Sequence, residues 1–278
     1  MPKFVHLHTH SHYSLLDGLA KIDGIIEYAK NDGAPAIALT DHGVMYGCIE
    51  FYQKCKKAGI KPIIGVEAYL APNSRHDKIT KEDEKNYYHL ILLAKNYEGY
   101  KNLIKLTSIA HLEGFYYKPR VDWEVLQEYS GGLIAMTACM GGEIPRLIRI
   151  GKPKKAKEKI LEYNRLFGQG NFYLEIQDHP ELEGQDEINK KFSRELNVPL
   201  AATNDAHYLE KEDAEAQDIL LCLQNKKKRE DRDRMNMTGV DYSLRPGREI
   251  AEAFKDVPEA IENTVKIADK CNLEIELG

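Results

Sequence analysis

The heptapeptide FVHLHTH at residues 4–10 is an apolar run that ends in two histidines, His8 and His10. In an extended strand, side chains two positions apart point to the same face, so these two imidazoles can bind one metal ion. A second apolar run, PLAAT at residues 199–203, is followed by Asn204 and then by Asp205 and His207, again two positions apart. Imidazole and carboxylate are ligands that suit zinc, manganese and iron. The repeated spacing therefore predicts a metal site built at the ends of strands.

The composition limits the class of protein. A chain of 278 residues is long enough for one α/β barrel with an appendage. Its net charge of -5 argues against a protein held on DNA or on an anionic membrane by bulk electrostatics. The start of the chain has no long apolar segment, and no run of about 18 apolar residues occurs, so we expect a cytoplasmic protein without a membrane partner. The five scattered cysteines form no C-x-x-C pair, which argues against a disulfide framework or a zinc ribbon.

Short apolar runs rich in β-formers alternate with longer stretches of helical periodicity, which is typical of a parallel α/β architecture. We expect strands at residues 4–10, 36–40, 62–70, 88–94, 133–137, 172–177 and 199–203. We expect helices between them at residues 22–31, 45–58, 98–110, 153–167 and 185–196. The polar segment 71–86 has no helical repeat, so a loop is expected where a regular barrel has a helix. The fold predicted is a distorted seven-stranded parallel (β/α)7 barrel.

The pattern changes after His207. Residues 212–224 favour a helix, and the tract KKKREDRDR at 226–234 has mixed charges that favour a solvated loop. A short strand is expected at residues 242–244, followed by helices at 248–254 and 258–271. We therefore divide the chain into a barrel at residues 1–209 and a C-terminal helical connector at residues 210–278.

Functional residues of parallel α/β barrels gather where the strands end. His8, His10, Asp41 and His42 end the first two runs, and Glu67 lies late in the third. The fifth run is followed by Cys139, and the seventh by Asp205 and His207. For the sixth run the choice of functional residue among Glu175, Asp178 and His179 stays open. His89 begins the fourth run, which is the wrong end in a parallel barrel.

Several of these residues also have ordinary explanations. Asp17 precedes Gly18, and Asp-Gly is a common turn pair. Cys139 could serve as a small buried apolar residue, and Glu67 as a buried carboxylate with satisfied hydrogen bonds. Asp41 points away from its neighbour His42 in a strand, so we expect it to support a ligand rather than to be one.

The set as a whole favours metal-assisted hydrolysis. It contains histidines, carboxylates and one thiol, and it lacks a Ser-His-Asp arrangement. A bound metal lowers the pKa of a water molecule to about 7 and supplies hydroxide as the nucleophile. Nine candidate ligands exceed the needs of one ion, so two or three divalent ions are expected. Multinuclear sites suit phosphodiester cleavage, and the two oxygens of Glu67 make it the natural bridge.

The motif His8-x-His10-x-x-x-Ser14-x-x-Asp17-Gly18, with TDHG at residues 40–43 and NDAH at residues 204–207, resembles the PHP (polymerase and histidinol phosphatase) family. Further segments look like the N-terminal region of bacterial replicative DNA polymerase III alpha subunits. In chain order these are HLHTHSHYSLLDGLAKI, ALTDHGVMYGCIEFY, AGIKPIIGVEAYLAP, GYKNLIKL, EGFYYKPRVD and VPEAIENTVKIADKCN.

This resemblance implies a barrel that holds up to three ions of zinc, manganese or iron. Its implied ligands are His8, His10, Glu67 and Asp205 for one ion, Glu67, His89 and Cys139 for a second, and Asp17, His42 and His207 for a third. Because every ligand position is filled, the resemblance implies a metal-dependent 3'-to-5' proofreading exonuclease that trims the 3' end of a DNA primer. It also implies that the remaining polymerase domains and other replisome subunits are partners.

Contacts to DNA are the least defined part of this hypothesis. Arg75, Lys118, Arg120 and the pair Tyr116-Tyr117 are the candidates, and solvated side chains on a hairpin are the alternative. Two other functions stay open. One is a non-catalytic, metal-stabilised structural module of the polymerase, and the other is a small-molecule phosphatase that shares only the metal motif.

Overall fold

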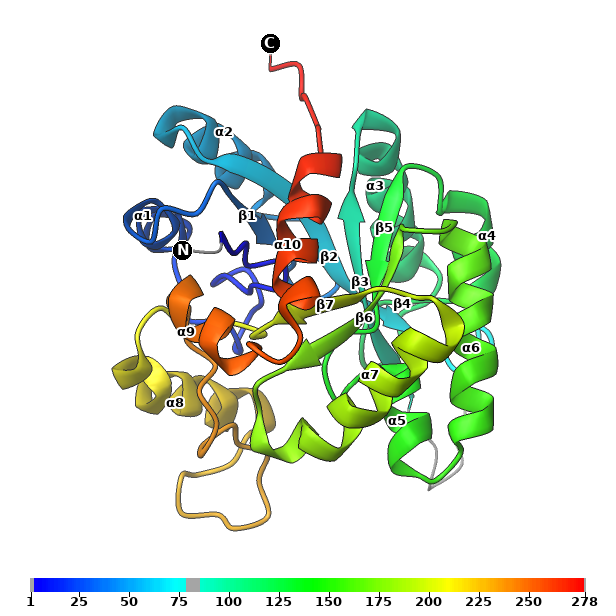
Figure 1. Cartoon of the computed structure of the whole chain (residues 1–278). Helices are drawn as coiled ribbons and strands as arrows, with labels where there is room; N and C mark the ends of the chain where they lie inside the picture. The colour runs from blue at the N-terminus through cyan, green and yellow to red at the C-terminus, as the bar shows by residue number, and fades with distance from the viewer. Residues whose placement is uncertain (1–2, 79–85, 278) are drawn as a thin grey trace.

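A computed structural model describes residues 3–78 and 86–277 as an α/β barrel (Figure 1). In these residues the sheet has seven strands in the order β1-β2-β3-β5-β6-β7, with β4 paired to β2. The strands are β1 Ala36–Leu39, β2 Lys61–Leu70, β3 Tyr88–Ala94, β4 Arg120–Val121, β5 Leu133–Met136, β6 Phe172–Gln177 and β7 Leu200–Thr203. The predicted fold class is confirmed, and six of the seven predicted runs form strands.

One strand departs from the predicted parallel arrangement. β3 runs antiparallel to both β2 and β5, whereas the other pairs in the sheet are parallel. A parallel pair needs a long crossover, usually through a helix, but an antiparallel pair does not. The described part of the predicted loop at 71–86 contains no helix, and residues 79–85 lie outside the described residues. The antiparallel course brings the start of β3 to the rim where the neighbouring strands end.

The expected first strand, residues 4–10, is not a regular strand. It is an extended segment between β1 and β7 whose single bridge joins Thr9 to Ala206. The Ala38 N–H donates to the His6 carbonyl at 2.9 Å, and the His10 N–H donates to the Ala206 carbonyl at 2.8 Å. Side chains replace part of the ladder, because the N–H groups of Val5 and Thr9 donate to threonine hydroxyls. The segment thus closes the barrel with irregular hydrogen bonding.

Helices surround the sheet, and the five predicted between strands are present within a few residues of their expected limits. They are α1 Ile22–Asn31, α2 Cys48–Ala58, α3 Tyr97–Leu112, α6 Pro153–Phe167 and α7 Glu183–Leu196. The short helices α4 Trp123–Tyr129 and α5 Glu143–Arg149 were not expected. The C-terminal part contains α8 Ala214–Asn225, α9 Gly247–Ala253 and α10 Pro258–Lys270, while the expected strand at 242–244 makes only a bridge from Ser243 to Tyr208. In the described ranges, no helix combines the length and the apolar character needed to cross a bilayer.

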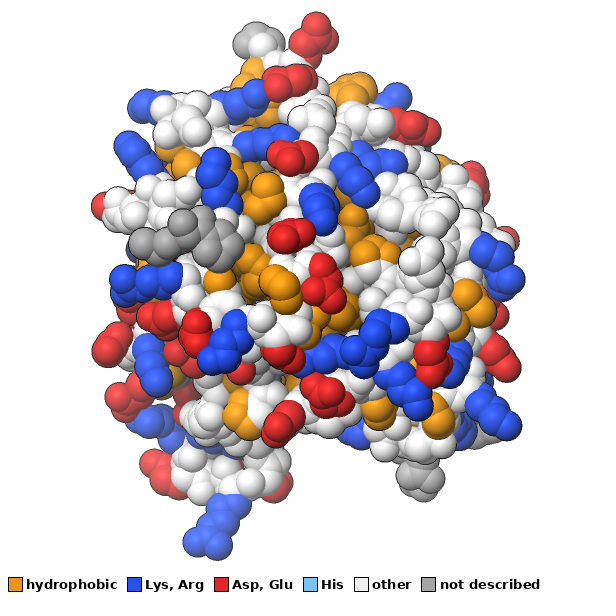
Figure 2. Space-filling view, viewed as in Figure 1, with side chains coloured by type: hydrophobic (Ala, Val, Ile, Leu, Met, Phe, Trp, Pro, Cys, Tyr) orange, Lys and Arg blue, Asp and Glu red, His pale blue; other side chains and the backbone are white. Residues whose placement is uncertain are grey.

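The helix α10 lies against the barrel instead of extending away from it (Figure 1). Its residues Ile267 and Ala268, and Cys271 just after its end, share a buried cluster with barrel residues such as Val5 and Leu7. The Lys61 ammonium, at the start of β2, donates to the Ala268 carbonyl, so α10 covers the amino-terminal end of the strands. Figure 2 shows acidic and basic side chains interspersed on this face. Residues after 209 therefore contribute to the barrel core, and the division at 209/210 stays a prediction.

Candidate metal centre

Glu67 lies at the centre of a cluster of histidines on the carboxyl-terminal rim. Its side chain, late in β2, is fully buried, and both of its oxygens face imidazole nitrogens. The nitrogens within 3.4 Å of these oxygens are Nδ1 of His42 at 2.6 Å, Nδ1 of His89 at 2.8 Å, Nε2 of His8 at 3.4 Å and Nε2 of His10 at 3.4 Å. His89 reaches this rim because β3 is antiparallel, which removes the objection raised from its position at the start of a strand.

Asp205 faces the same pair of histidines from the loop after β7. Its Oδ1 lies 2.9 Å from Nε2 of His8 and 3.2 Å from Nε2 of His10. Asp205 has a φ of 51°, a left-handed conformation that is uncommon outside glycine but tolerated by aspartate. The two strand-end pairs identified by their spacing thus meet in space.

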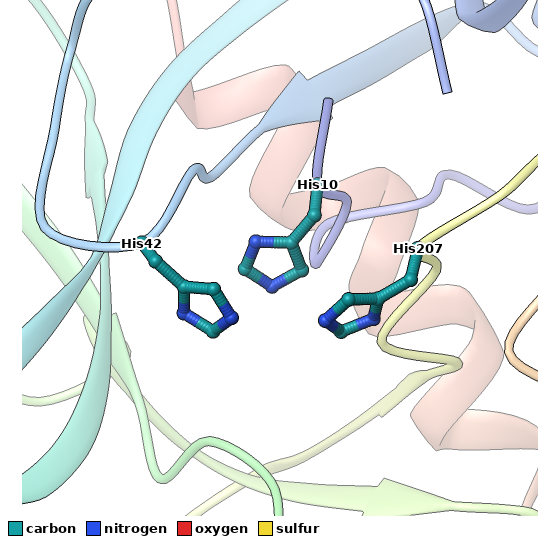
Figure 3. A group of neighbouring side chains, drawn as sticks. All are labelled: His10, His42 and His207. Carbon is teal, nitrogen blue, oxygen red and sulfur yellow. The ribbon is translucent and has the colours of Figure 1, made fainter. Parts of the chain in front are cut away.

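A third group lies beside the first two. Figure 3 shows His10, His42 and His207, carried by three separate segments, with their rings turned toward a common space. These three rings each offer a nitrogen within 4.8 Å of the others. Asp17 adds a carboxylate, with Oδ2 at 3.2 Å from Nε2 of His42 and Oδ1 at 3.7 Å from Nε2 of His207. The Asp-Gly pair at 17–18 therefore carries a side chain of the cluster as well as forming a turn.

Cys139, in the loop after β5, approaches the cluster from the side. Its Sγ lies 4.0 Å from Oε1 of Glu67 and 4.0 Å from Nδ1 of His89. The structure brings all nine predicted ligand residues to one rim.

The donor atoms of this cluster fit bound cations. Buried polar atoms are nearly always hydrogen-bonded in proteins. In the described part of the chain, the buried atoms without a hydrogen-bond partner include five atoms of this cluster that lie close to one another. They are Nε2 of His8, Nε2 of His10, Nδ1 of His42, Oε2 of Glu67 and Oδ1 of Asp205. Convergent imidazole nitrogens and carboxylate oxygens are the chemistry of a site for zinc, manganese or iron.

The electrostatics keep the carboxylates ionised. Burial alone raises the pKa of Glu67, but the surrounding histidines, His89 first, outweigh burial and hold that pKa well below its usual range. The pKa of Asp205 is lowered in the same way, with His8 as the main opposing charge. Burial, followed by His42 and His207, lowers the pKa of His10 to about 3, which keeps its imidazole neutral.

The thiol of Cys139 behaves differently. Burial first, and then the carboxylates of Asp205 and Glu67, raise its pKa well above the usual value. In the absence of a cation the sulfur therefore keeps its proton. A coordinated thiol is deprotonated by the ion that binds it, so binding by Cys139 would release a proton.

Buried acceptors on the outer side of the histidines fix the orientation of the rings. Nδ1 of His8 lies 2.7 Å from Oε1 of Glu175, and the same oxygen accepts hydrogen bonds from Gln177 and Thr203. With Nδ1–H directed at Glu175, Nε2 of His8 points toward Asp205 and is placed to bind a cation. Glu175 is one of the three residues near the end of the sixth run among which the sequence did not select a functional residue. The alternation of Tyr173, Glu175 and Gln177 along β6 is the signal that could have selected it, since these three share one face.

Asp41 supports His10 through a serine. Ser14 Oγ lies 2.9 Å from Nδ1 of His10 and donates to Oδ1 of Asp41 at 2.7 Å. Asp41 also accepts the Ser11 N–H at 2.7 Å. This geometry agrees with the supporting role expected for Asp41, and it identifies Ser14 as the residue between them.

Two of the three cations expected to bind nucleic acid are used inside the protein. Arg120 is 1% exposed, and its guanidinium donates to the carbonyls of Gly114, Asn86, Arg75 and Asp77. The Arg75 guanidinium forms ion pairs with Glu113, Asp122 and Glu124. Acceptors that only the folded chain brings near take up both charges, so DNA contacts by Arg75 and Arg120 stay a prediction that this geometry does not support. Lys118 is half-buried, with its ammonium 5.3 Å from the centre of the Tyr69 ring.

Comparison with known proteins places these features in context. The model of the PHP domain matches residues 6–179. The DNA polymerase III subunit alpha of Borreliella burgdorferi is 53% identical over 273 residues, covering 97% of this chain and 24% of the relative. The corresponding subunit of Treponema pallidum is 45% identical over 278 residues, covering 98% of this chain and 23% of the relative. The chain spans about a quarter of the length of the curated relatives it matches.

A solved structure from Bifidobacterium adolescentis, described as a metal-dependent phosphoesterase, is 14% identical. It covers 91% of this chain and 97% of its own, with a TM-score of 0.49. A match at this level carries no functional weight.

Proposed function

The chain belongs to the PHP domain family, and on that premise we propose that it is a metal-dependent phosphoesterase domain of a DNA polymerase III alpha subunit. The observation that carries this proposal is the convergence of four histidine nitrogens on the buried carboxylate of Glu67. In its specific form, the activity is that of a 3'-to-5' exonuclease acting on the 3' end of a DNA primer.

The proposed ligands divide into three groups around Glu67. They are His8, His10, Glu67 and Asp205 for one ion, Glu67, His89 and Cys139 for a second, and Asp17, His42 and His207 for a third. Zinc, manganese or iron bound there would polarise a phosphoryl oxygen and lower the pKa of a water molecule. We propose two or three such ions.

The chain's own residues supply position and charge. Glu67 presents one oxygen to His89 and the other to His42, so it can join two neighbouring groups. Glu175 and Ser14 hold the rings of His8 and His10 from behind, so that Nε2 of each ring faces Asp205. Rings held in this way need little reorganisation when a cation or a phosphoryl group arrives.

The similarity to alpha subunits also supports proposals about context. The remaining polymerase domains of a longer polypeptide and other replisome subunits are the proposed partners, and the cytoplasm is the proposed location. The direction of digestion rests on the resemblance to replicative polymerases.

An exonuclease assay tests this function. The purified chain is incubated with Mn²⁺ or Zn²⁺ and a 5'-labelled primer that carries a 3' mismatch. We expect stepwise shortening that His8→Ala and Asp205→Ala reduce by about 100-fold or more, because each removes a group that converges on the centre. His76→Ala is the matched control, since the His76 side chain is 59% exposed and lies outside the cluster. Cleavage without metal, or unchanged cleavage by the first two variants, would contradict the proposal.

A non-catalytic, metal-stabilised module of the polymerase is the second candidate. The internal use of Arg75 and Arg120 favours it, since fewer cations then remain to hold DNA at the rim. This function predicts bound metal and a lower melting temperature after chelation, with no shortening of the primer in the same assay.

A further inference from the structure

A short hairpin at residues 114–120 lies directly beside the metal centre. Gly43, next to His42, has a φ of 63°, and a Cβ placed there would lie 3.0 Å from both Pro119 and Tyr69. Nε2 of His111 lies 3.1 Å from the Gly43 carbonyl oxygen. The absence of a side chain at Gly43 therefore lets the hairpin approach the loop that carries His42.

The hairpin is held in one conformation from beneath. The buried Arg120 guanidinium joins the Gly114 carbonyl to the carbonyls of three other residues. A Cβ at Gly114 would lie 1.9 Å from the Arg120 carbonyl oxygen, so the turn closes only with glycine there. Tyr116 packs over the same guanidinium at 5.1 Å. The buried guanidinium of Arg120 thus has a structural role, which is to fix the hairpin.

One side chain of this hairpin, that of Lys118, lies against the surroundings of the centre, and the neighbouring Tyr117 packs edge-on against Tyr116 at 4.7 Å. The Lys118 ammonium lies over the ring of Tyr69, and that ring is 5.9 Å from the ring of His42 and 5.3 Å from the ring of His89. Tyr117 is 72% exposed and has a φ of 60°, a left-handed conformation that is costly for an aromatic residue. Strained backbone conformations of this kind cluster at functional sites, and here the strained residue is next to Lys118.

We propose that Tyr117 and Lys118 form a subsite for a single-stranded nucleic acid, with a base stacked on the Tyr117 ring and a backbone phosphate held by Lys118. This subsite rests on the proposed phosphoesterase function, since it serves a strand whose end enters the metal centre. Stacking on an aromatic ring accepts every base, and a single ammonium binds phosphate without sequence preference. The subsite therefore suits an enzyme that removes any terminal nucleotide.

Rigidity is what makes this hairpin a better platform than an ordinary exposed loop. A backbone that is already fixed loses little conformational freedom when a base stacks on a ring that it carries. The remainder of the chain offers a matched pair for comparison. Lys101 lies 5.3 Å over the ring of Tyr97, which is 53% exposed at the start of α3, on the opposite rim of the barrel.

Binding of a fluorescein-labelled oligothymidylate to the purified chain, followed by fluorescence anisotropy at several salt concentrations, tests the subsite. Tyr117→Gly removes the ring and also relieves the left-handed strain, so it is expected to fold. We expect it to weaken binding by about ten-fold, and Tyr117→Phe to retain wild-type binding. Lys118→Gln should lower the slope of log affinity against log salt by about 0.7, and Lys118→Arg should retain the slope. Tyr97→Gly and Lys101→Gln are the controls and should bind like the wild type.

The outcomes separate the subsite from the proposed function. Absence of wild-type binding, or equal binding by the wild type, Tyr117→Gly and Lys118→Gln, overturns the subsite. Hydrolysis of bis(p-nitrophenyl) phosphate, compared between the wild type and Asp205→Ala, reports on the metal centre. If the wild type does not hydrolyse this compound but the binding results are as expected, the phosphoesterase function is overturned and the subsite still stands.

Discussion

Replacing Glu175 by glutamine should weaken metal binding without unfolding the protein. Oε1 of Glu175 faces Nδ1 of His8 at 2.7 Å and also accepts hydrogen bonds from Gln177 and Thr203. A glutamine has the same shape, and its amide oxygen can accept the same donors. The substitution therefore removes mainly the negative charge that holds the His8 proton on Nδ1.

The size of the effect follows from this role. Removing a carboxylate that orients a metal-binding histidine costs roughly 10- to 100-fold in metal affinity. This range corresponds to about 1.4–2.8 kcal/mol of binding free energy. Glu175 is 2% exposed, so water cannot take the place of the lost charge, and we expect the upper half of the range.

Competition with a chromophoric chelator for Zn²⁺ or Mn²⁺ measures the affinity. Asp186→Asn is the matched control, since Asp186 is also buried and accepts the Gln177 N–H. Wild-type affinity in Glu175→Gln, or an equal loss in Asp186→Asn, would refute the orienting role.

Three further predictions concern stability. Arg120→Met should destabilise the protein by about 2–4 kcal/mol in urea unfolding, because four carbonyls lose their donor; unchanged stability would show that the hairpin does not depend on it. Burial raises the pKa of Asp186 to about 8, so its contribution to stability is complete below the unfolded value near 3.8 and is lost as the pH rises toward 8. The melting temperature of the wild type should therefore fall relative to that of Asp186→Asn across this window, and a constant difference would contradict the shift. Ile267 is fully buried in α10, so Ile267→Ala should lower the free energy of unfolding by about 2–5 kcal/mol and leave the metal content unchanged. A loss of metal would show that the two ends of the barrel are coupled.

Local spacing in the sequence is enough to find the histidines and acids of the rim. His8 and His10, or Asp205 and His207, are close in sequence, and each pair lies at or just after the end of an apolar run, so both pairs can be found without knowledge of the fold. Strand direction is not local. The antiparallel course of β3 depends on its pairing with β2 and β5, so the position of His89 could not be derived from a parallel barrel.

Partners of charged residues are also hidden from the sequence. Arg75 and Arg120 are residues of the type that binds phosphate. The groups that accept their hydrogen bonds come from segments that only the folded chain brings near. The backbone hydrogen bonds of residues 4–10 are likewise not predictable from the sequence. Their apolar alternation favours a strand, whereas the hydroxyls of Thr40 and Thr264 take hydrogen bonds that a ladder would have used.

Metal content tests the central claim most directly, which is that the side chains around Glu67 form a multinuclear metal centre. The purified chain is loaded with Zn²⁺ or Mn²⁺, freed of excess ion by gel filtration, and analysed for metal per polypeptide alongside Glu67→Ala. We predict two or three ions in the wild type and at least one fewer in the variant, because Glu67 is shared between groups. Less than one ion in the wild type, or the same content in both proteins, would contradict the account.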